Sequence, residues 1–159
     1  RFWHDLRTEE MYTRRKIEQE KADKKRQRLM RIEQRKIARG FAKFVKKYSS
    51  LTHCSTNADF AVLIAKNPAD LEAEGKALHH CVGSGTYDKK MSRGETIIFF
   101  IRRINEIETP FVTFEYSPSS KKILQCYAKN NTKPEDNVMQ FVENEWLPNA
   151  NKKVQKIAA

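Results

Sequence analysis

The pattern of hydrophobic and polar positions divides the chain into a long charged segment and a shorter, more apolar one. Residues 5–48 contain no proline and one glycine, Gly40, and they are rich in good helix formers, so a helix is predicted there. Apolar residues recur at i, i+4, i+7, i+8 and i+11 from Ile37, which predicts that residues 29–48 dock on a domain or a partner. Gly40 lies inside this pattern and marks an expected break between two helices.

Strand-like segments follow, separated by turn-forming residues. Residues 49–58 are rich in Ser, Thr and Asn and are predicted to be a connector. The apolar run 59–65 predicts a buried strand, with a short helix as the competing interpretation. Three further segments, at 95–103, 110–116 and 122–128, are apolar or alternating. The Ser-Pro-Ser-Ser linker between the last two predicts that they pair antiparallel, in a three-stranded meander.

Two short helices are predicted between the first strand and the meander. Asn67-Pro68 offers a capping side chain and a residue suited to the first helical position. This helix should run to about Leu78 or Cys81, where a Gly-Ser-Gly loop begins two residues later. Residues 87–93 predict the second helix, closed by Gly94.

The predicted fold class is α+β. A long basic N-terminal helical arm (1–48) and the connector precede a domain at 59–148, which contains a strand, two short helices, the three-stranded antiparallel meander and a closing helix. Pro148 is predicted to stop that closing helix, because proline disrupts a helix interior. Residues 149–159 then form a basic tail, which we expect to be frayed.

Charge distinguishes the arm from the domain. Residues 1–48 carry 17 Lys and Arg against 7 Asp and Glu, whereas residues 49–159 carry 14 against 13. Clustered basic residues supply phosphate affinity, so nucleic acid is the predicted partner. An anionic membrane surface, an acidic protein and a merely solvated helix are the alternatives. The residues predicted to bind nucleic acid are Arg14, Arg15, Lys16, Lys21, Lys24, Lys25, Arg26, Arg28, Arg31, Arg35 and Lys36.

The remaining composition bounds the environment of the protein. Three cysteines give no disulfide framework, which favours a reducing compartment and hence the cytoplasm. No run of 18 apolar residues exists, so no membrane span is predicted. The first residues lack an initiator Met and are not a signal peptide. The apolar cluster Phe2, Trp3 and Leu6 predicts a protein partner for the N-terminal helix, or upstream sequence of a longer protein.

The string His79-His80-Cys81 precedes a loop whose backbone amides could cradle an anion, although the spacing fits no standard phosphate loop. A helix-ending turn with a buried Cys81 is the structural alternative. A cysteine nucleophile is disfavoured, because adjacent side chains on a helix point apart and His80 is a poor base for Cys81. Zinc is also disfavoured, because the chain contains no Cys-x-x-Cys pair, so no metal is predicted and the cofactor is unknown.

Polar residues of the meander offer a second kind of site. Alternation places Thr113 and Glu115 on one face of their strand, and Gln125 on one face of the next together with Ile123 and Tyr127. These polar side chains either face solvent or share a pocket with residues of earlier and later elements. The catalytic candidates are His80, Tyr87, Glu115 and Gln125. The ligand-binding candidates are Cys81, Gly83, Ser84, Thr113, Asn130 and Asn131.

Several motifs occur in a distinctive order: Glu74 to Val82, Tyr87, Gly94, Arg102-Arg103, Pro110 to Glu115, Gln125, Lys129-Asn130-Asn131 and Trp146. Over roughly residues 58–148, this series resembles the PcfJ-like proteins of bacterial conjugative plasmids, integrative elements and phages. The resemblance implies a bacterial cytoplasmic protein associated with mobile DNA and conjugation, with a basic variable region ahead of the domain. It carries over no catalytic activity, and Ala128 stands where the family usually has glycine.

Three functions are therefore weighed. The leading hypothesis is a nucleic-acid-associated (DNA-binding) accessory protein of a mobile genetic element, with a basic arm for phosphate contact and a polar pocket in the domain. The second is an enzyme that acts on a nucleotide or nucleic acid through His80, Tyr87, Glu115 and Gln125. The third is a protein-interaction module without catalysis.

Overall fold

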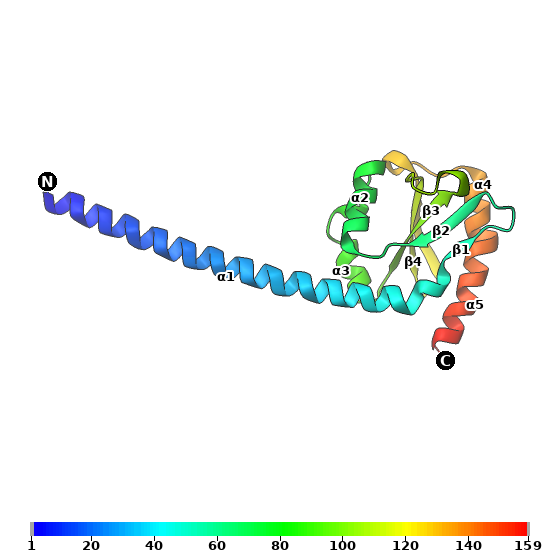
Figure 1. Cartoon of the computed structure of the whole chain (residues 1–159), viewed down its shortest axis with the longest axis horizontal. Helices are drawn as coiled ribbons and strands as arrows, with labels where there is room; N and C mark the ends of the chain where they lie inside the picture. The colour runs from blue at the N-terminus through cyan, green and yellow to red at the C-terminus, as the bar shows by residue number, and fades with distance from the viewer. Residues whose placement is uncertain (1, 159) are drawn as a thin grey trace. The chain divides into compact units, whose positions relative to one another are not determined.

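The computed structural model describes residues 2–158, and the mixed α+β class predicted from the sequence is confirmed. Figure 1 shows the elements in chain order. The helices are α1 (Phe2–Tyr48), α2 (Pro68–Leu78), α3 (Tyr87–Ser92), α4 (Asp136–Phe141) and α5 (Leu147–Ala158). The strands are β1 (His53–Cys54), β2 (Phe60–Ile64), β3 (Ile97–Arg103), β4 (Val112–Ser117) and β5 (Lys122–Tyr127). Short turns of 3-10 helix include η2 (Cys81–Gly83) and η4 (Lys129–Asn131).

The chain divides into two compact units, residues 1–36 and 37–159, and the boundary falls inside α1. The later part of the segment predicted to dock is packed in the second unit, where Phe41 and Tyr48 are buried, whereas Leu29 and Met30 are more than half exposed. Docking of residues 29–36 on a partner, the other part of that prediction, stays a prediction. The expected break at Gly40 is wrong, because α1 is continuous through it. A Cβ at Gly40 would lie 2.2 Å from the Ser92 carbonyl oxygen, so this glycine permits a close approach between α1 and the end of α3.

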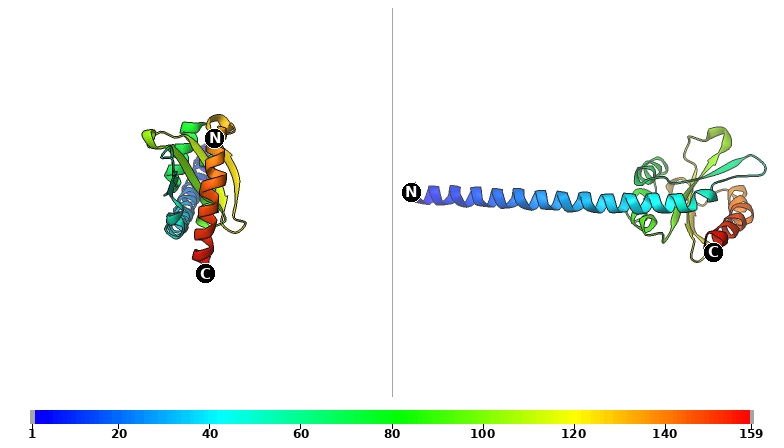
Figure 2. Two further views of the ribbon diagram at one scale, coloured as in Figure 1. Left: turned by 90° about the vertical axis from the view of Figure 1, so that its right-hand side faces the viewer. Right: turned by 60° about the horizontal axis from the view of Figure 1, so that its bottom comes forward.

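The second unit is built on an antiparallel sheet whose five strands pair in chain order, β1-β2-β3-β4-β5. The predicted meander is confirmed as β3, β4 and β5, and β2 extends it. β1 lies in the segment predicted to be only a connector, and it pairs with β2 through His53 and Cys54. Figure 2 shows the sheet with helices on either side of it. In the part of the chain that the structure describes, no helix is both long and apolar enough to cross a membrane.

An irregularity in the β4–β5 pairing sets which side chains share a face. Glu115 lies opposite Gln125, but the next residue of β4, Tyr116, lies opposite Ile123. Leu124 is therefore an extra residue on β5, as in a β-bulge, and it is half exposed. The predicted grouping of Ile123 with Gln125 and Tyr127 is wrong, because the bulge moves Ile123 to the face of Tyr116.

The closing helix does not stop at Pro148. A π-helical turn at Val142–Trp146 joins α4 to α5, and the helix continues to Ala158. The π turn breaks the regular ladder of hydrogen bonds just ahead of the proline, which lacks an N–H to donate. Residues 149–158 are thus packed helix rather than frayed tail, since Ala150 and Val154 are buried.

Trp146 anchors this C-terminal helix on the sheet. Its ring lies edge-on to the rings of Phe99, Phe114 and Tyr116, with centroids 4.7–5.2 Å apart. Its Nε1 donates to the carbonyl oxygen of Leu51 at 2.8 Å. The core of the second unit therefore includes residues of the sheet, the end of α1, α2, α3 and the closing helix, and a cavity lies on the face of the sheet that bears Ile98.

Candidate functional site

The cavity encloses about 380 Å³. Its floor is the face of β3, β4 and β5 that bears Ile98, Thr113, Glu115, Gln125 and Tyr127. Phe114 of β4 also contributes to the lining. The remaining lining residues come from the turn after α2, the start of α3 and the segment after β5, and they are His80, Cys81, Val82, Tyr87 and Asn131. Because Ile98 and Gln125 both pair with Glu115, strand pairing alone brings the centre of the floor together.

Glu115 is the centre of this site. Its side chain is 3% exposed, and Gln125 Nε2 donates to Glu115 Oε1 at 3.0 Å. The same nitrogen donates to Tyr87 Oη, also at 3.0 Å, so three of the four predicted catalytic candidates form one hydrogen-bonded group. Glu115 Oε2 is buried and has no hydrogen-bond partner among residues 2–158.

His80, the fourth catalytic candidate, lines the same cavity but is held by other partners. It caps η2, where its Nδ1 accepts from the Val82 N–H at 3.5 Å, so the ring proton belongs on Nε2. Nε2 lies 3.0 Å from Thr113 Oγ1, and this hydroxyl donates to Glu74 Oε1 at 3.3 Å. Both ring nitrogens are therefore occupied, and the ring is positioned rather than free to accept a proton.

Burial determines the protonation state of His80. Desolvation lowers the pKa of His80 from its ordinary value of 6.5, and it outweighs the backbone hydrogen bond and the negative charge of Glu74, which both act to raise it. His80 is thus neutral at neutral pH, which agrees with a ring that accepts at Nδ1 and donates at Nε2.

Behind His80 and Thr113 lies an ion pair that sequence reasoning missed. Arg102 donates from Nη1 to Glu74 Oε1 at 2.8 Å and from Nη2 to Oε2 at 2.6 Å, and both side chains are buried. The sequence signal that could have revealed the pair is Arg102, a charged residue at the end of the apolar strand β3. Glu74 was missed as well, because a glutamate on a short helix is usually exposed. The pair neutralises both charges, and Glu115 has no ion-pair partner among residues 2–158.

The ligand-binding candidates divide into two groups. Cys81, Thr113 and Asn131 line the cavity, whereas Gly83, Ser84 and Asn130 do not. Gly83 instead packs on α2, where an added Cβ would lie 2.9 Å from Glu72 Cα. Cys81 is exposed rather than buried.

No lysine or arginine lines the cavity, so its described walls offer no cation to a phosphate. Sequence reasoning did not single out the other lining residues, Val82, Ile98, Phe114 and Tyr127.

Metal-binding groups do not gather in this structure. Within residues 2–158, no three His, Cys, Asp or Glu side chains come together in a way that would hold a metal ion. One polar cluster outside the cavity contains Glu145, His53 and Thr56. Glu145 accepts hydrogen bonds from Thr56 and lies 2.7 Å from His53 Nε2, so it connects the closing helix to β1 and the turn that follows β1.

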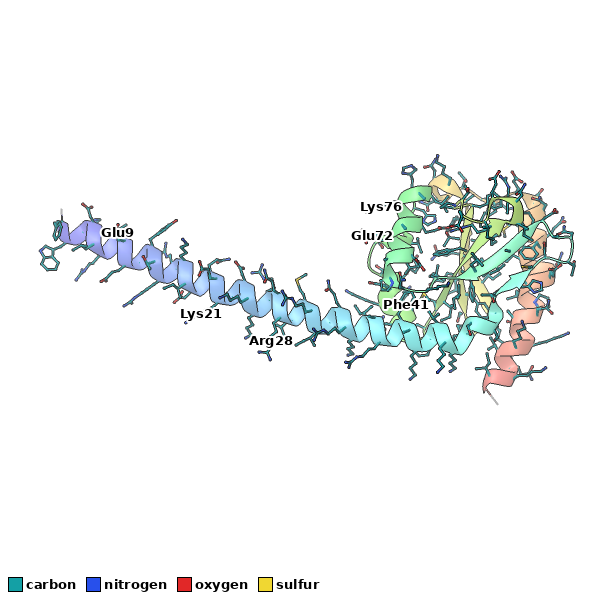
Figure 3. All side chains as sticks on the ribbon, viewed as in Figure 1. Glu9, Lys21, Arg28, Phe41, Glu72 and Lys76 are labelled. Carbon is teal, nitrogen blue, oxygen red and sulfur yellow. The ribbon has the colours of Figure 1, made fainter. Side chains whose placement is uncertain are left out.

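The basic residues of α1 form the second candidate site. All eleven predicted nucleic-acid-binding residues are exposed, and Arg26 alone has an acidic partner, Asp23 at 3.5 Å, among the described residues. Four of them, Arg14, Lys21, Arg28 and Arg35, recur every seven residues and therefore share one side of the helix. Figure 3 shows the Lys21 and Arg28 side chains extending from α1.

The fold and the site define an α+β protein with a polar, carboxylate-centred cavity on one face of an antiparallel meander. The model of the PcfJ-like protein family matches residues 1–142, and the chain belongs to that family. The match extends the resemblance seen in residues 58–148 into the basic arm.

The chain is also similar to a curated protein. The chain is 34% identical over 97 residues to the uncharacterized protein Lin1253/Lin1744 of Listeria innocua serovar 6a. The alignment covers 61% of this chain and 21% of that protein, so the chain matches about a fifth of the length of the curated relative. No solved structure matches.

Proposed function

We propose that this protein is a nucleic-acid-associated accessory protein of a bacterial mobile genetic element that acts in the cytoplasm. The array of exposed basic residues on α1 carries the proposal. Between residues 14 and 36 the helix bears eleven Lys and Arg against four Asp and Glu, and ten of the eleven have no ion-pair partner among the described residues. Such a helix gains affinity for phosphates by releasing counterions, whatever the base sequence.

The role of the domain follows from what its cavity lacks. Its lining contains no lysine or arginine, so phosphate contact belongs to the arm. The cavity offers amide, hydroxyl, imidazole and carboxylate groups, which suit a neutral, hydrogen-bonding ligand. In this proposal the arm supplies affinity for the phosphates of nucleic acid, and the cavity selects the ligand by its hydrogen-bonding groups.

Salt dependence tests the arm. Binding of a labelled oligonucleotide to the 159-residue chain is measured by fluorescence anisotropy as salt rises from about 50 to 200 mM, a range over which several phosphate contacts weaken affinity by orders of magnitude. The variant Arg14→Gln, Lys21→Gln, Arg28→Gln, Arg35→Gln should reduce the slope of log K against log salt by about 3, at 0.7–0.9 for each lost contact. DNA and RNA, single- and double-stranded, are compared.

A matched control removes four exposed lysines of the second unit, Lys66, Lys89, Lys129 and Lys133, by substitution with glutamine. This variant has the same net charge as the arm variant, and it should keep the wild-type slope. If the two variants bind alike, or if wild-type binding does not change with salt, the proposed role of the arm is wrong.

Two other functions have observations in their favour. The buried Glu115 carboxylate beside Tyr87 and Gln125 would suit an enzyme that acts on a nucleotide or nucleic acid, and turnover of a nucleotide that Glu115→Gln abolishes would support it. Phe2 and Trp3, 72% and 79% exposed, would suit a protein-interaction module. Crosslinking from position 3 to another protein, in the absence of nucleic-acid binding, would favour that alternative.

A further inference from the structure

The cavity contains a buried carboxylate that is only partly satisfied. Glu115 Oε1 accepts from Gln125 Nε2, whereas Oε2 is buried and has no hydrogen-bond partner among residues 2–158. A buried acceptor without a partner destabilises the folded protein, and a ligand that donates to it removes that cost. Because a carboxylate repels anions, the part of the ligand that faces Glu115 carries N–H or O–H donors and is not a phosphate.

A hydroxyl donor lies beside this carboxylate. Gln125 Nε2 donates to both Tyr87 Oη and Glu115 Oε1, at 3.0 Å each, so a single nitrogen bridges the two oxygens. Both amide hydrogens are then used, and the Tyr87 oxygen acts as an acceptor. No residue within 2–158 accepts the Tyr87 hydroxyl hydrogen, which leaves it for a ligand. The cavity thus presents one donor and, next to it, two acceptors.

Guanine has the complementary edge. Its Watson–Crick side carries the acceptor O6 followed by two adjacent donors, N1–H and N2–H. Adenine, cytosine, thymine and uracil have no two adjacent donors on this edge. When one of them donates to one carboxylate oxygen, an acceptor of the base faces the other carboxylate oxygen, and two acceptors repel each other. We propose that the cavity binds a guanine base, with Glu115 accepting from N1–H and N2–H and Tyr87 donating to O6. This inference deepens the proposed function and rests on it for the choice of a base over other N–H donors.

The walls fit a flat ring attached to a strand or a sugar. Tyr127, which is 40% exposed, and Ile98 both lie on the floor of the cavity, so an aromatic and an aliphatic side chain offer apolar surface to one face of a ring. The volume of about 380 Å³ is ample for one base. A free guanine nucleotide and an unpaired guanine of a single strand share this chemistry, whereas base pairing in a duplex hides the edge.

Calorimetric titration of the 159-residue chain with guanosine tests the proposal. Guanosine has no phosphate, so its binding does not depend on the arm. We expect saturable binding that weakens about 10- to 100-fold when one hydrogen bond to the carboxylate is lost. Inosine lacks the N2 amine and 1-methylguanosine lacks N1–H, so both should show this loss, and adenosine should not compete. These ligand comparisons use only the wild-type protein and do not depend on any variant folding.

Variants test the same contacts from the protein side. Glu115→Gln replaces one acceptor with a donor and should weaken guanosine about 10- to 100-fold. Tyr87→Phe removes the O6 donor and should weaken inosine and guanosine by the same factor. Glu108→Gln, at an exposed position outside the cavity, is the matched control and should bind as the wild type does. Guanosine should also slow alkylation of Cys81, which lines the cavity, and leave Cys54 unaffected.

Equal affinity for guanosine, inosine and adenosine, or no binding of any of them, overturns the proposal. Binding of methylguanidinium without binding of guanosine also overturns it, because the site would then recognise a guanidinium group. If guanosine fails while the arm retains its salt-dependent binding, this inference alone is wrong. If guanosine binds and the arm variant binds nucleic acid as the wild type does, the proposed role of the arm fails. Guanosine monophosphate and a single-stranded oligonucleotide with one guanine then identify the source of the base.

Discussion

Arg102 and Glu74 meet through two hydrogen bonds, of 2.8 and 2.6 Å, inside the second unit, where neither side chain is more than 8% exposed. Glu74 also accepts from Thr113, which contacts His80 at the edge of the cavity. The pair therefore links β3 to α2 and supports one wall of the site. Removing one charge leaves the other buried without a partner, which is more costly than replacing both.

We expect Glu74→Gln to lower the free energy of unfolding by about 3–5 kcal/mol, because it leaves the Arg102 guanidinium unpaired. Urea unfolding followed by circular dichroism measures the change. Glu72→Gln, on the same helix, removes an exposed pair with Lys76 at 3.2 Å and should cost at most about 1 kcal/mol. Figure 3 shows both of these control residues. A Glu74 variant as stable as the Glu72 variant would contradict the structural role of the buried pair.

Gly40→Ala should destabilise the protein. Helix propensity alone predicts the opposite, since alanine is favoured over glycine by about 1 kcal/mol within a helix. The added Cβ would lie 2.2 Å from the Ser92 carbonyl oxygen, so α1 or the end of α3 has to move. Ala42→Gly, at an exposed position of the same helix, measures the propensity effect by itself. A higher unfolding midpoint for Gly40→Ala would show that the two backbones are not in close contact.

The stability of the folded protein should depend on His80 below neutral pH. Burial lowers the pKa of His80 in the folded protein below its ordinary value of 6.5. The unfolded chain therefore binds the proton first, and stability is lost as pH falls from 6.5 through the folded pKa. His80→Asn keeps an oxygen acceptor for the Val82 N–H and does not titrate. The free energy of unfolding of the wild type, minus that of this variant, should decrease as the pH falls from 6.5 through the folded pKa of His80. A difference that stays constant with pH would contradict the prediction.

Cys126 should resist alkylation in the folded protein. Burial, with a further contribution from the Glu143 charge, raises the pKa of Cys126 to about 12, so its reactive thiolate is scarce. Cys54 and Cys81 are exposed and should react first with iodoacetamide. Peptide mass spectrometry assigns the order, and Cys126→Ser confirms the slow site. Labelling of Cys126 as fast as Cys54 would show that β5 opens readily to solvent.

Local signals predicted most of the fold. Asn67 caps α2 as expected, accepting from the Asp70 N–H at 2.9 Å, and Gly94 follows α3 with a φ of +72°. The meander followed from alternation and one turn, because neighbouring strands joined by a short linker pair antiparallel. Strand pairing then placed Glu115 opposite Gln125, which is why one face of two predicted strands became the floor of the cavity.

The errors lie where a residue depends on contacts that its sequence neighbours do not reveal. An alternating pattern does not show the extra residue Leu124, so the face of Ile123 was assigned wrongly. Pro148 was interpreted by a rule for regular helices, but a π turn precedes it. Glu74 and Arg102 both occur in the series of motifs, but their pairing gave no local signal, because only the fold brings Arg102 to Glu74. Whether the cavity residues bind or react with a ligand stays a prediction.

The order of strands along the sheet has a consequence for how the chain folds. Each strand pairs only with its neighbours in the sequence, so most of the sheet forms without closing a long loop. The hydrogen bond from Trp146 to the Leu51 carbonyl joins residues 95 positions apart in the sequence. We expect β3, β4 and β5 to assemble early and the closing helix to dock late, so substitutions at Trp146 should mainly speed unfolding and leave the refolding rate nearly unchanged.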